Sequence, residues 1–355
     1  MKPVTRAICR GSPILEKPHE SPPMKALRSH ATGGPETLTL DEIDAPVPAK
    51  GQVLIAVKAC AINFPDTLMI RDLYQFKPER PYAPGGEIAG VIEAVGEGVT
   101  RWNVGDKVLC GTGNGGLSEK IAVDAGRLFA IPDGVSFETA SAILMTYGTN
   151  IHGLKDRGHI KAGDTLLVLG AAGGVGLAAV ELGKAWGARV IAAVSSEEKA
   201  AIAREAGADE VVIYPTGALD KGQQRALTDA FKAACGPDGA NLIYDIVGGD
   251  YSEPALRAIA WEGRFLVVGF PAGIAKMPLN LTLLKSCDIC GVFWGAFTAR
   301  EPEKNAAHIA ELFALLKAGK INPRVSQTFP LERGGEAIKL LEDRKAVGKV
   351  VVTMG

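Results

Sequence analysis

The sequence lacks long hydrophobic runs and strong net charge, and each absence excludes a class of partner. Its 355 residues carry a formal net charge of −1, so no face is expected to present the basic field that attracts nucleic acid or a membrane surface. No apolar run reaches the roughly 18 residues that a membrane-spanning helix needs. We therefore predict that neither nucleic acid nor a membrane is a partner.

Cysteine is also scarce, and its spacing argues against a metal site. The six cysteines are scattered, and the one close pair, Cys287 and Cys290, has no second pair to complete a zinc site. Reduced thiols and a cytoplasmic location are the expectation. Histidine forms no recognisable constellation with cysteine, serine or acids, so structural roles are predicted for His30, His152, His159 and His308.

The first 23 residues differ from the rest of the chain. They contain five prolines and neither a periodic apolar pattern nor the apolar core of a secretory signal. We predict a disordered extension over residues 1–23, or an upstream start with the domain beginning at Met24. A transit peptide is the weaker alternative because Glu16 and Glu20 are acidic.

A glycine cluster inside residues 165–198 is the most informative feature that is present. A short apolar run, Thr165–Leu169, predicts a buried strand; a helical pattern reaches Trp186, and a second strand is predicted at Val190–Val194. Strand, glycine turn, helix and strand make the unit that binds a dinucleotide pyrophosphate at a helix N-terminus. The turn reads AAGGVG, with alanine at the usual first glycine, and its predicted cofactor-binding residues are Ala172, Gly173, Gly174, Val175 and Gly176. A purely structural tight turn is the alternative.

The end of the second strand indicates which dinucleotide binds. Sites that prefer NAD place an acid there to hold the ribose 2′-hydroxyl, whereas this strand ends in Ser195 and Ser196, followed by Lys199. Two hydroxyls and an ammonium attract a 2′-phosphate that a carboxylate would repel. NADPH is therefore the predicted cofactor, although Lys199 also suits an ordinary solvated helix lysine.

The remaining pattern predicts an α/β protein of two domains. Short strands separated by turn residues run from Met24 to about Pro132 (37–40, 52–61, 90–95 and 107–110), which suggests a small barrel-like domain. From 165 to about 295, six strands alternate with helices and predict a doubly wound parallel sheet: 166–169, 190–194, 211–214, 242–245, 265–269 and 289–294. A helix near 303–317 and a final strand, Lys349–Thr353, are expected to pack back onto the barrel.

Several segments together resemble one known family, the quinone oxidoreductases of the medium-chain dehydrogenase/reductase superfamily. The likeness runs from about Met24 to the C-terminus and is carried by AINFPDTLMIRDLY (61–74), PYAPGGEIAGVIEAVGEGV (81–99), VGDKVLCG (104–111), LGAAGGVGLAAVELGKAWGARVIA (169–192), GADEVVIY (207–214), YDIVGGD (244–250), GRFLVVGF (263–270) and GKVVV (348–352). The resemblance implies a GroES-like catalytic domain at 24–148 and 296–355, a Rossmann domain for NADPH at 149–295, and an active site between them.

The resemblance is to the zinc-independent members. Zinc-dependent relatives place a cysteine where this chain has Asn63 and a histidine where it has Gly86, and the loop 111–116 lacks the four cysteines of a structural zinc lobe. Aldehyde reduction through an alkoxide requires a Lewis acid. Hydride addition to a quinone or an enone gives a delocalised anion that hydrogen bonds can stabilise, so these substrates are the expectation.

Position in the family motifs implies further site residues, each with a structural alternative. Asn63 and Tyr74 match residues near the nicotinamide and the substrate and are the predicted catalytic residues; a turn residue and a buried aromatic are their alternatives. Asp66 matches a recurrent acid of the same family motif, and a helix-capping role is its alternative. The remaining predicted cofactor contacts are Thr149, Tyr214, Val247, Gly269, Phe270 and Lys349, of which Lys349 is equally a plain surface lysine.

Two other functions remain open from the sequence. An enoyl-thioester reductase of the acryloyl- or crotonyl-coenzyme A type would use Tyr74 as the acid and needs basic residues at the cleft mouth, for which Arg71, Lys77 and Arg80 are candidates. A non-enzymatic NADPH-binding structural protein is the third possibility. The resemblance also implies a homodimer, with an exposed edge strand around 289–294 pairing across a two-fold axis.

Overall fold

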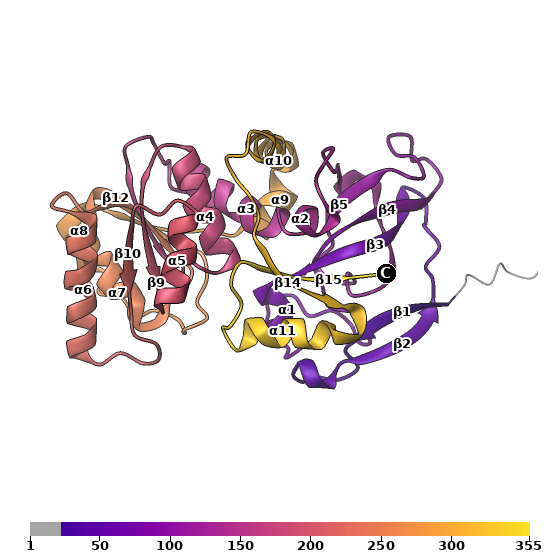
Figure 1. The fold of residues 1–355 in the computed structure, drawn as a ribbon, viewed down its shortest axis with the longest axis horizontal. Coiled ribbons are helices and arrows are strands. Elements are labelled where there is room, and N and C mark those ends of the chain that lie inside the picture. Colours follow the sequence, from indigo (N-terminus) through magenta and orange to yellow (C-terminus); the bar gives the residue numbers. More distant parts are fainter. Residues whose placement is uncertain (1–22) are drawn as a thin grey trace, which may run out of the picture.

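Two β-sheets frame the molecule, and the chain passes from the first to the second and back (Figure 1). The computed structural model describes residues 23–355. The extension predicted at the N-terminus lies outside this range, except that Pro23 already begins strand β1 (Pro23–Arg28). Both the α/β class and the pairing of a GroES-like domain with a parallel-sheet domain are confirmed.

The first sheet belongs to the catalytic domain and places β15, the last strand of the chain, beside strands from its first third. Its order is β14-β15-β3-β4-β5-β7, with β6 also paired to β3, and a separate ribbon pairs β1 with β2. The final strand packs onto the barrel as predicted, because β15 runs antiparallel to β3. The strands are β2 (Thr39–Asp44), β3 (Gln52–Ile62), β4 (Glu87–Val95), β5 (Lys107–Gly111), β6 (Lys120–Asp124), β7 (Leu128–Ala130), β14 (Val325–Pro330) and β15 (Lys349–Thr353).

The second sheet is parallel throughout and has the strand order of a dinucleotide-binding fold, β10-β9-β8-β11-β12-β13. Along β8, Leu166 and Val168 enter the core on one face while Leu167 and Leu169 enter the core on the other. A strand covered by helices on both faces is apolar at every position, which is why the sequence pattern found it. The strands are β8 (Thr165–Leu169), β9 (Arg189–Val194), β10 (Glu210–Ile213), β11 (Ala240–Asp245), β12 (Ile259–Val267) and β13 (Asp288–Gly291).

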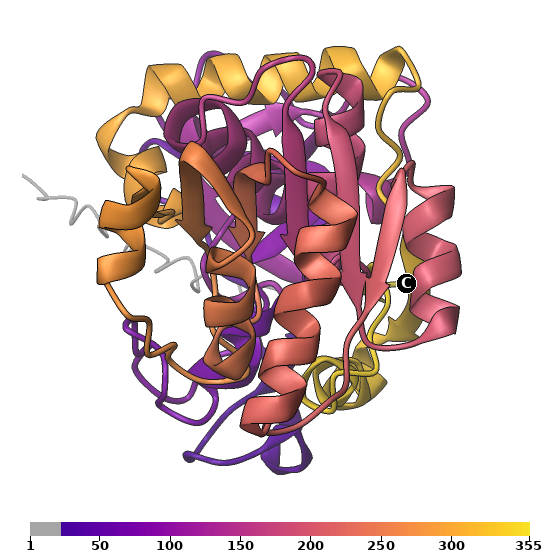
Figure 2. The same ribbon diagram turned by 90° about the vertical axis from the view of Figure 1, so that its left-hand side faces the viewer.

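Helices cover the faces of this sheet and bridge the domains (Figure 2). Those of the nucleotide domain are α4 (Gly174–Ala185), α5 (Glu197–Glu205), α6 (Lys221–Cys235), α7 (Ser252–Leu256) and α8 (Asn280–Lys285). The bridging layer consists of α3 (Leu144–Ile151), α9 (Trp294–Arg300) and α10 (Pro302–Lys317). The catalytic domain carries α1 (Phe64–Met69), α2 (Phe137–Ser141) and α11 (Gly334–Glu342).

Several details differ from the prediction: strands β1, β6, β7 and β14 were not predicted, and β12 begins at Ile259 rather than at 265. The strand predicted at 37–40 was wrong at its start, because Pro35 opens a 3-10 turn that ends at Thr37 before β2 begins. The strand predicted at 289–294 was too long, since β13 ends at Gly291 and Trp294 begins α9. The helix predicted near 303–317 is present as α10, but it packs on α3 and α9 rather than on the barrel.

The bridging helices also explain why the domain limits are hard to read from sequence. The predicted limits at 148/149 and 295/296 fall inside α3 and α9. Both helices are continuous there and bury apolar side chains, so no polar or proline-rich linker marks the crossing.

Backbone contacts fix the two domains against each other beside the glycine turn. Gly348, next to the start of β15, donates to the carbonyl of Ala172 at 3.0 Å, and Gly173 and Gly348 form a parallel bridge. The backbone N–H of Met145 in α3 donates to the Glu87 carboxylate at 3.0 Å. The Gly348 contacts bring the start of the catalytic domain's last strand to the cofactor turn of the nucleotide domain, and the Met145 contact ties α3 to β4 beside it.

Two further findings bear on the sequence-based expectations. Over residues 23–355, no helix has the length and apolarity to cross a membrane. The five cysteines in the same range are all unpaired thiols, and four of them are buried.

Candidate active site

A cleft of about 2110 Å³ lies between the two domains, and it gathers residues from every motif singled out in the sequence. Of the sixteen predicted site residues, fifteen line it; the exception is Ser196. Most of the remaining wall is apolar, with side chains from α3, α9 and α10. A largely apolar cleft with a few converging polar groups is the usual form of a small-molecule site.

The glycine turn forms the floor of the cleft. No side chain caps the N-terminus of α4 at Gly173, so the first N–H groups of the helix face the cleft with its positive dipole end. A Cβ on Gly176 would lie 2.2 Å from the carbonyl oxygen of Gly170, and one on Gly174 would lie 2.9 Å from the Lys349 side chain. The turn therefore requires glycine at both positions, and the helix end stays open to an anion.

The tip of β9 lies at one end of the cleft. The Lys199 ammonium donates to the Ser195 hydroxyl at 3.1 Å, and Tyr214 stands beside them, packed against Tyr251 at 5.0 Å between ring centroids. Burial raises the pKa of Tyr214 well above its usual range, so its hydroxyl stays protonated. Ser196 has a different role: its hydroxyl accepts from the Lys199 backbone and caps α5.

Arg344 belongs to this end of the cleft, and sequence reasoning missed it. It lies on the loop before β15, lines the cleft, and its carbonyl accepts from the Lys199 ammonium at 3.4 Å. Its guanidinium is close enough to oppose the burial that raises the pKa of Tyr214. The catalytic domain thus places a second cation beside Lys199, a pairing across 145 residues that no local pattern reveals.

The loops after β11 and β12 complete the cofactor side. Val247, Gly269 and Phe270 line the cleft there, at the carboxyl ends of parallel strands where ligands bind in doubly wound sheets. Buried Asp245 holds the first loop in shape, because its carboxylate accepts from the N–H groups of Val247 and Gly248, each at 2.9 Å.

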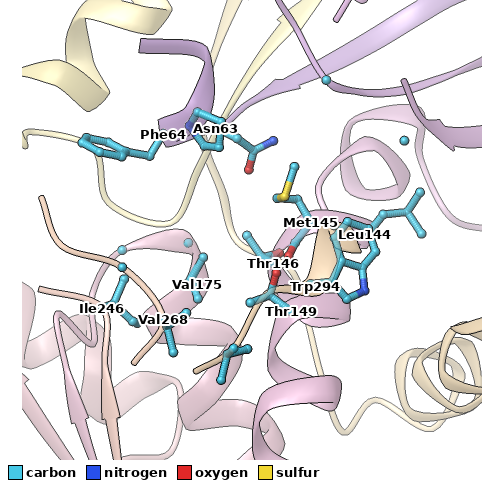
Figure 3. A pocket seen from close by; sticks show the side chains of 18 of the residues that line it. Asn63, Phe64, Leu144, Met145, Thr146, Thr149, Val175, Ile246, Val268 and Trp294 are labelled. Atoms are coloured by element: carbon cyan, nitrogen blue, oxygen red, sulfur yellow. Dashed lines mark hydrogen bonds between the residues drawn. The ribbon is translucent and has the colours of Figure 1, made fainter. Parts of the chain in front are cut away.

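The other end of the cleft lies between Asn63 and α3. Figure 3 shows the Asn63 amide facing Met145 and Thr146, with Val175 and Val268 on the nucleotide side and Trp294 on the far wall. Thr149 lies on the same wall, and its hydroxyl donates to the Met145 carbonyl at 2.5 Å. The Thr149 oxygen therefore faces the cleft as a hydrogen-bond acceptor.

The central polar group of this end is a buried cluster of Asn63, Glu87 and Lys349. The Lys349 ammonium donates to Asn63 Oδ1 at 2.6 Å and to Glu87 Oε2 at 3.1 Å. The two amide hydrogens of Asn63 go to Glu87 Oε2 at 3.0 Å and to the Ala61 carbonyl at 3.3 Å. Asn63, Glu87 and Lys349 are 6%, 1% and 4% exposed. Lys349 is therefore not a surface lysine, and Asn63 has no amide hydrogen left for a ligand.

Glu87 is the second residue that sequence reasoning missed. It is the first residue of β4, and it links Asn63, Lys349 and the backbone of Met145 next to the domain junction. An unpaired buried charge is costly, so Lys349 and Glu87 each require the other. The available signal was a carboxylate directly after Gly86 and directly before the apolar run 88–92.

Asp66 lies beneath this cluster as a helix cap. Its carboxylate accepts from the backbone N–H of Asn63 at 2.8 Å and of Gly85 at 3.0 Å, which fixes the start of α1 and thereby Asn63. Burial raises the pKa of this carboxyl from 3.8 to about 6. Tyr74 is half-buried on the cleft wall nearby, and burial together with the Asp66 charge raises the pKa of its phenol.

The raised pKa of Asp66 predicts a pH-dependent stability. The folded state retains this proton up to about pH 6, whereas the unfolded chain loses it near pH 3.8, so the stabilisation is largest at low pH and disappears as pH rises through 6. The Asp66→Asn variant has no titrating carboxyl at this position, so its free energy of unfolding lacks this dependence on pH. We expect the free energy of unfolding of wild type, relative to Asp66→Asn, to fall by about 1.4 kcal/mol between pH 5 and pH 8. Urea unfolding at both values measures it, and a pH-independent difference would contradict it.

Two of the four histidines, His152 and His308, lie in a packed group behind the cleft. His152 donates from Nδ1 to the Asp156 carboxylate at 2.8 Å and stacks on Phe297 at 4.0 Å between ring centroids, and His308 also stacks on Phe297, at 5.4 Å. This group joins α9 and α10 to the end of α3, behind the cleft wall formed by Trp294.

Comparison with known families agrees with this geometry. The model described as alcohol dehydrogenase GroES-like domain matches residues 49–133, and that described as zinc-binding dehydrogenase matches residues 174–311. The quinone oxidoreductase-like protein 2 homolog of Nematostella vectensis is 39% identical over 306 residues, covering 85% of this chain and 81% of the relative. Human quinone oxidoreductase is 32% identical, covering 93% and 98%.

This chain belongs to the quinone oxidoreductase family of the medium-chain dehydrogenases/reductases. Among solved structures, Escherichia coli quinone oxidoreductase complexed with NADPH superposes with a TM-score of 0.84 at 29% identity, covering 93% of this chain and 99% of that one. A mycobacterial protein complexed with NADPH gives a TM-score of 0.85 at 32% identity, covering 93% and 99%. An oxidoreductase activity follows from this membership.

Within residues 23–355, no group of three or more His, Cys, Asp or Glu side chains is arranged to hold a metal ion. At Gly86 an added Cβ would lie 3.1 Å from the Gly113 carbonyl oxygen, so a histidine there requires the loop above it to move.

Proposed function

We propose that this protein is an NADPH-dependent reductase that transfers hydride to quinones or related conjugated carbonyls without a bound metal. The observation that carries the proposal is the Asn63–Glu87–Lys349 cluster, which presents one buried ammonium to the cleft beside the open end of α4. Relatives named quinone oxidoreductase and two solved complexes with NADPH support it.

The residues present fit NADPH along the whole length of the cleft. The uncapped helix end at Gly173 suits a pyrophosphate. Ser195, Lys199 and Arg344 offer a hydroxyl and two cations where a 2′-phosphate would lie, and the tip of β9 carries no carboxylate. Thr149 and Val268 line the end nearest Lys349, where the nicotinamide is expected.

The bound cofactor supplies the hydride, and the protein's residues stabilise the charge that forms on the substrate oxygen. Lys349 has three N–H donors, of which Asn63 and Glu87 take two. The third is free to donate to an oxygen in the cleft, so we assign the oxyanion contact to Lys349 and a positioning role to Asn63. A charged donor held in a dry site is worth more than one in water because the dielectric is low.

Tyr74 is the candidate second donor. Its phenol remains protonated at neutral pH because its pKa is raised, and it lines the substrate side of the cleft. A protonated hydroxyl can hydrogen-bond a phenolate or an enolate and deliver a proton to it. Lys349 and Tyr74 together provide hydrogen-bond stabilisation of the kind that a delocalised anion needs.

The two alternatives receive less support from the geometry. Arg71 pairs with Glu342 at 2.6 Å and Arg80 with Asp72 at 2.8 Å, and neither they nor Lys77 line the cleft. None of the three cations proposed for coenzyme A therefore lines the cleft. A structural protein that only binds NADPH would need no buried lysine held between two partners at the substrate end.

A substrate panel with NADPH tests the proposal. We expect oxidation of NADPH with 1,2-naphthoquinone and 9,10-phenanthrenequinone to exceed that with crotonyl-coenzyme A in kcat/KM. Turnover of the thioester alone would assign the protein to the enoyl-thioester reductases, and turnover of none of these would support the structural role.

We also predict a homodimer. Strand β13 is the edge of the six-stranded sheet, and Phe293, which follows it, is 59% exposed. An unpaired edge next to exposed apolar side chains favours pairing with a second copy across a two-fold axis. Multi-angle light scattering should give twice the 37.1 kDa of one chain. A mass of 37.1 kDa at every concentration would rule this out.

A further inference from the structure

The charge along the cleft wall is unbalanced, although the chain as a whole is nearly neutral. Five cations and one carboxylate line the cleft, in a protein of net charge −1: Arg101, Arg127, Lys199, Arg344, Lys349 and Asp343. Asp343 is itself paired with Lys339 at 2.8 Å. Clefts lined by one sign of charge concentrate ligands of the opposite sign.

The proposed function accounts for three of these cations. Lys199 and Arg344 lie together at the end assigned to the 2′-phosphate, and Lys349 is held by Glu87 and Asn63. Arg101 and Arg127 are left over. Both belong to the catalytic domain, on the side of the cleft away from β9, and among residues 23–355 neither has a carboxylate within ion-pairing distance.

These two arginines form one corner of the cleft. The Arg101 guanidinium stacks over the ring of Trp102 at 5.1 Å, and Trp102 donates from its indole nitrogen to the Ala125 carbonyl at 2.9 Å, two residues before Arg127. Arg127 donates to the carbonyl of Gly111, which also lines the cleft. The Trp102–Ala125 hydrogen bond therefore holds the chain segments that carry Arg101 and Arg127 next to each other, and both arginines line the cleft there.

Between this corner and Lys349 the cleft wall is apolar. Leu128 and Phe129 follow Arg127 in the sequence and line the cleft from β7. Leu144 and Met145, which precede Thr146 in α3, line it as well. A ligand that reaches from Lys349 to Arg127 thus meets a cation at each end and carbon between them. An amphiphilic molecule matches that order.

Resting on the proposed function, we propose that the preferred substrates carry an anionic group, carboxylate or sulfonate, on the side away from the carbonyl that is reduced. The arginine pair recognises this group, since guanidinium binds such oxyanions with two parallel N–H donors. The same chemistry occurs in the phosphates of a coenzyme A thioester, so the experiment distinguishes these two sources.

The test compares kcat/KM for 1,2-naphthoquinone-4-sulfonate and for 1,2-naphthoquinone in wild type, Arg101→Gln, Arg127→Gln and the double variant, with crotonyl-coenzyme A as a further substrate. The sulfonate alters the reactivity of the quinone, so the quantity that matters is the ratio of the two kcat/KM values across variants. We expect each single variant to lower the ratio by about 3–10-fold, since the pair is partly exposed to solvent. The loss should shrink at high salt.

Two control variants separate this result from a change in loop structure. Lys107→Gln removes an exposed cation on the neighbouring strand that does not line the cleft, and its ratio should equal that of wild type. Arg127→Lys keeps the charge and should recover part of the ratio. If Arg127 raises kcat/KM only for crotonyl-coenzyme A, the anion site is supported, and the anionic group that it binds is a phosphate of coenzyme A.

A binding measurement keeps this inference distinct from the proposed function. Calorimetry of naphthalene-2-sulfonate with the NADP⁺ complex should give a dissociation constant about 3–10-fold weaker in Arg127→Gln than in wild type. If Arg127→Gln binds the sulfonate more weakly than wild type but no quinone is turned over, only the proposed function is overturned. Equal ratios in all variants, or equal binding, would overturn the anion site.

Discussion

Lys349→Met is expected to lower kcat/KM for 1,2-naphthoquinone by about 10²–10³-fold, the cost of removing one oxyanion donor from a preorganised site. Lys349 supplies the free N–H of the buried cluster, while the hydrogens of Asn63 are already committed. The loss should be in kcat more than in KM, because the contact strengthens as charge forms on the substrate oxygen. Stopped-flow and steady-state measurements at saturating NADPH report it.

A second variant shows whether such a loss comes from chemistry or from misfolding. Lys349→Met leaves the Glu87 carboxylate buried without its partner, which is itself destabilising by about 3–5 kcal/mol. The double variant Glu87→Gln with Lys349→Met removes the uncompensated charge, so it should regain much of the free energy of unfolding and none of the activity. Recovery of activity in the double variant would show that Lys349 only balances Glu87.

Ser195→Asp is expected to reverse the cofactor preference. A carboxylate at the tip of β9 would repel a 2′-phosphate and accept a hydrogen bond from a ribose 2′-hydroxyl. Because Lys199 donates to Ser195 at 3.1 Å, the new acid would also neutralise the cation that attracts the phosphate. We expect the dissociation constant of NADPH to rise about 100-fold, about 2.7 kcal/mol, and that of NADH to fall.

The structure offers matched controls for the cofactor prediction. Lys199→Ala should weaken NADPH alone. Ser196→Ala changes the adjacent hydroxyl, which caps α5 and does not line the cleft; it should cost about 1 kcal/mol of stability and leave the preference unchanged. Equal affinities of wild type for NADPH and NADH would contradict the assignment of the 2′-phosphate site.

Local chemistry explains why the nucleotide domain could be predicted from the sequence. Strand β8 is apolar on both faces, the turn after it needs glycine at 174 and 176, and Ser195 directly follows the next strand. These features are contiguous in the chain, and few structures other than a dinucleotide-binding unit would produce them together. The absence of an acid at the end of β9 is equally local, so the cofactor site could be inferred residue by residue.

The substrate side could be predicted only in part, because long-range pairing creates it. Lys349 is separated by 262 residues from Glu87, and its burial depends on β15 returning to β3 beside the glycine turn. Read alone, a lysine before an apolar strand looks exposed. The role expected of Asn63 changed for the same reason: both of its amide hydrogens are used by groups that the sequence does not place beside it.

Ser196 shows that a local pattern can also be insufficient to predict the role of a residue. Adjacent serines at a strand end look equivalent in the sequence, yet β-strand side chains alternate and the helix that follows needs a cap. Ser195 consequently faces the cleft while Ser196 accepts from the Lys199 backbone. A capping pattern with acids at 197 and 198 was visible, but it did not decide which serine would take that role.

The central proposal is that a bound NADPH reduces a conjugated carbonyl without zinc, with Lys349 and Tyr74 as the hydrogen-bond donors. Its most direct test is the rate of NADPH oxidation with 1,2-naphthoquinone, measured on protein whose metal content is determined by mass spectrometry in the same sample. We predict turnover with NADPH well above that with NADH, at much less than one zinc per chain and unchanged by chelator. Activity that requires one tightly held zinc per chain, or no turnover of the quinone by intact protein, would contradict it.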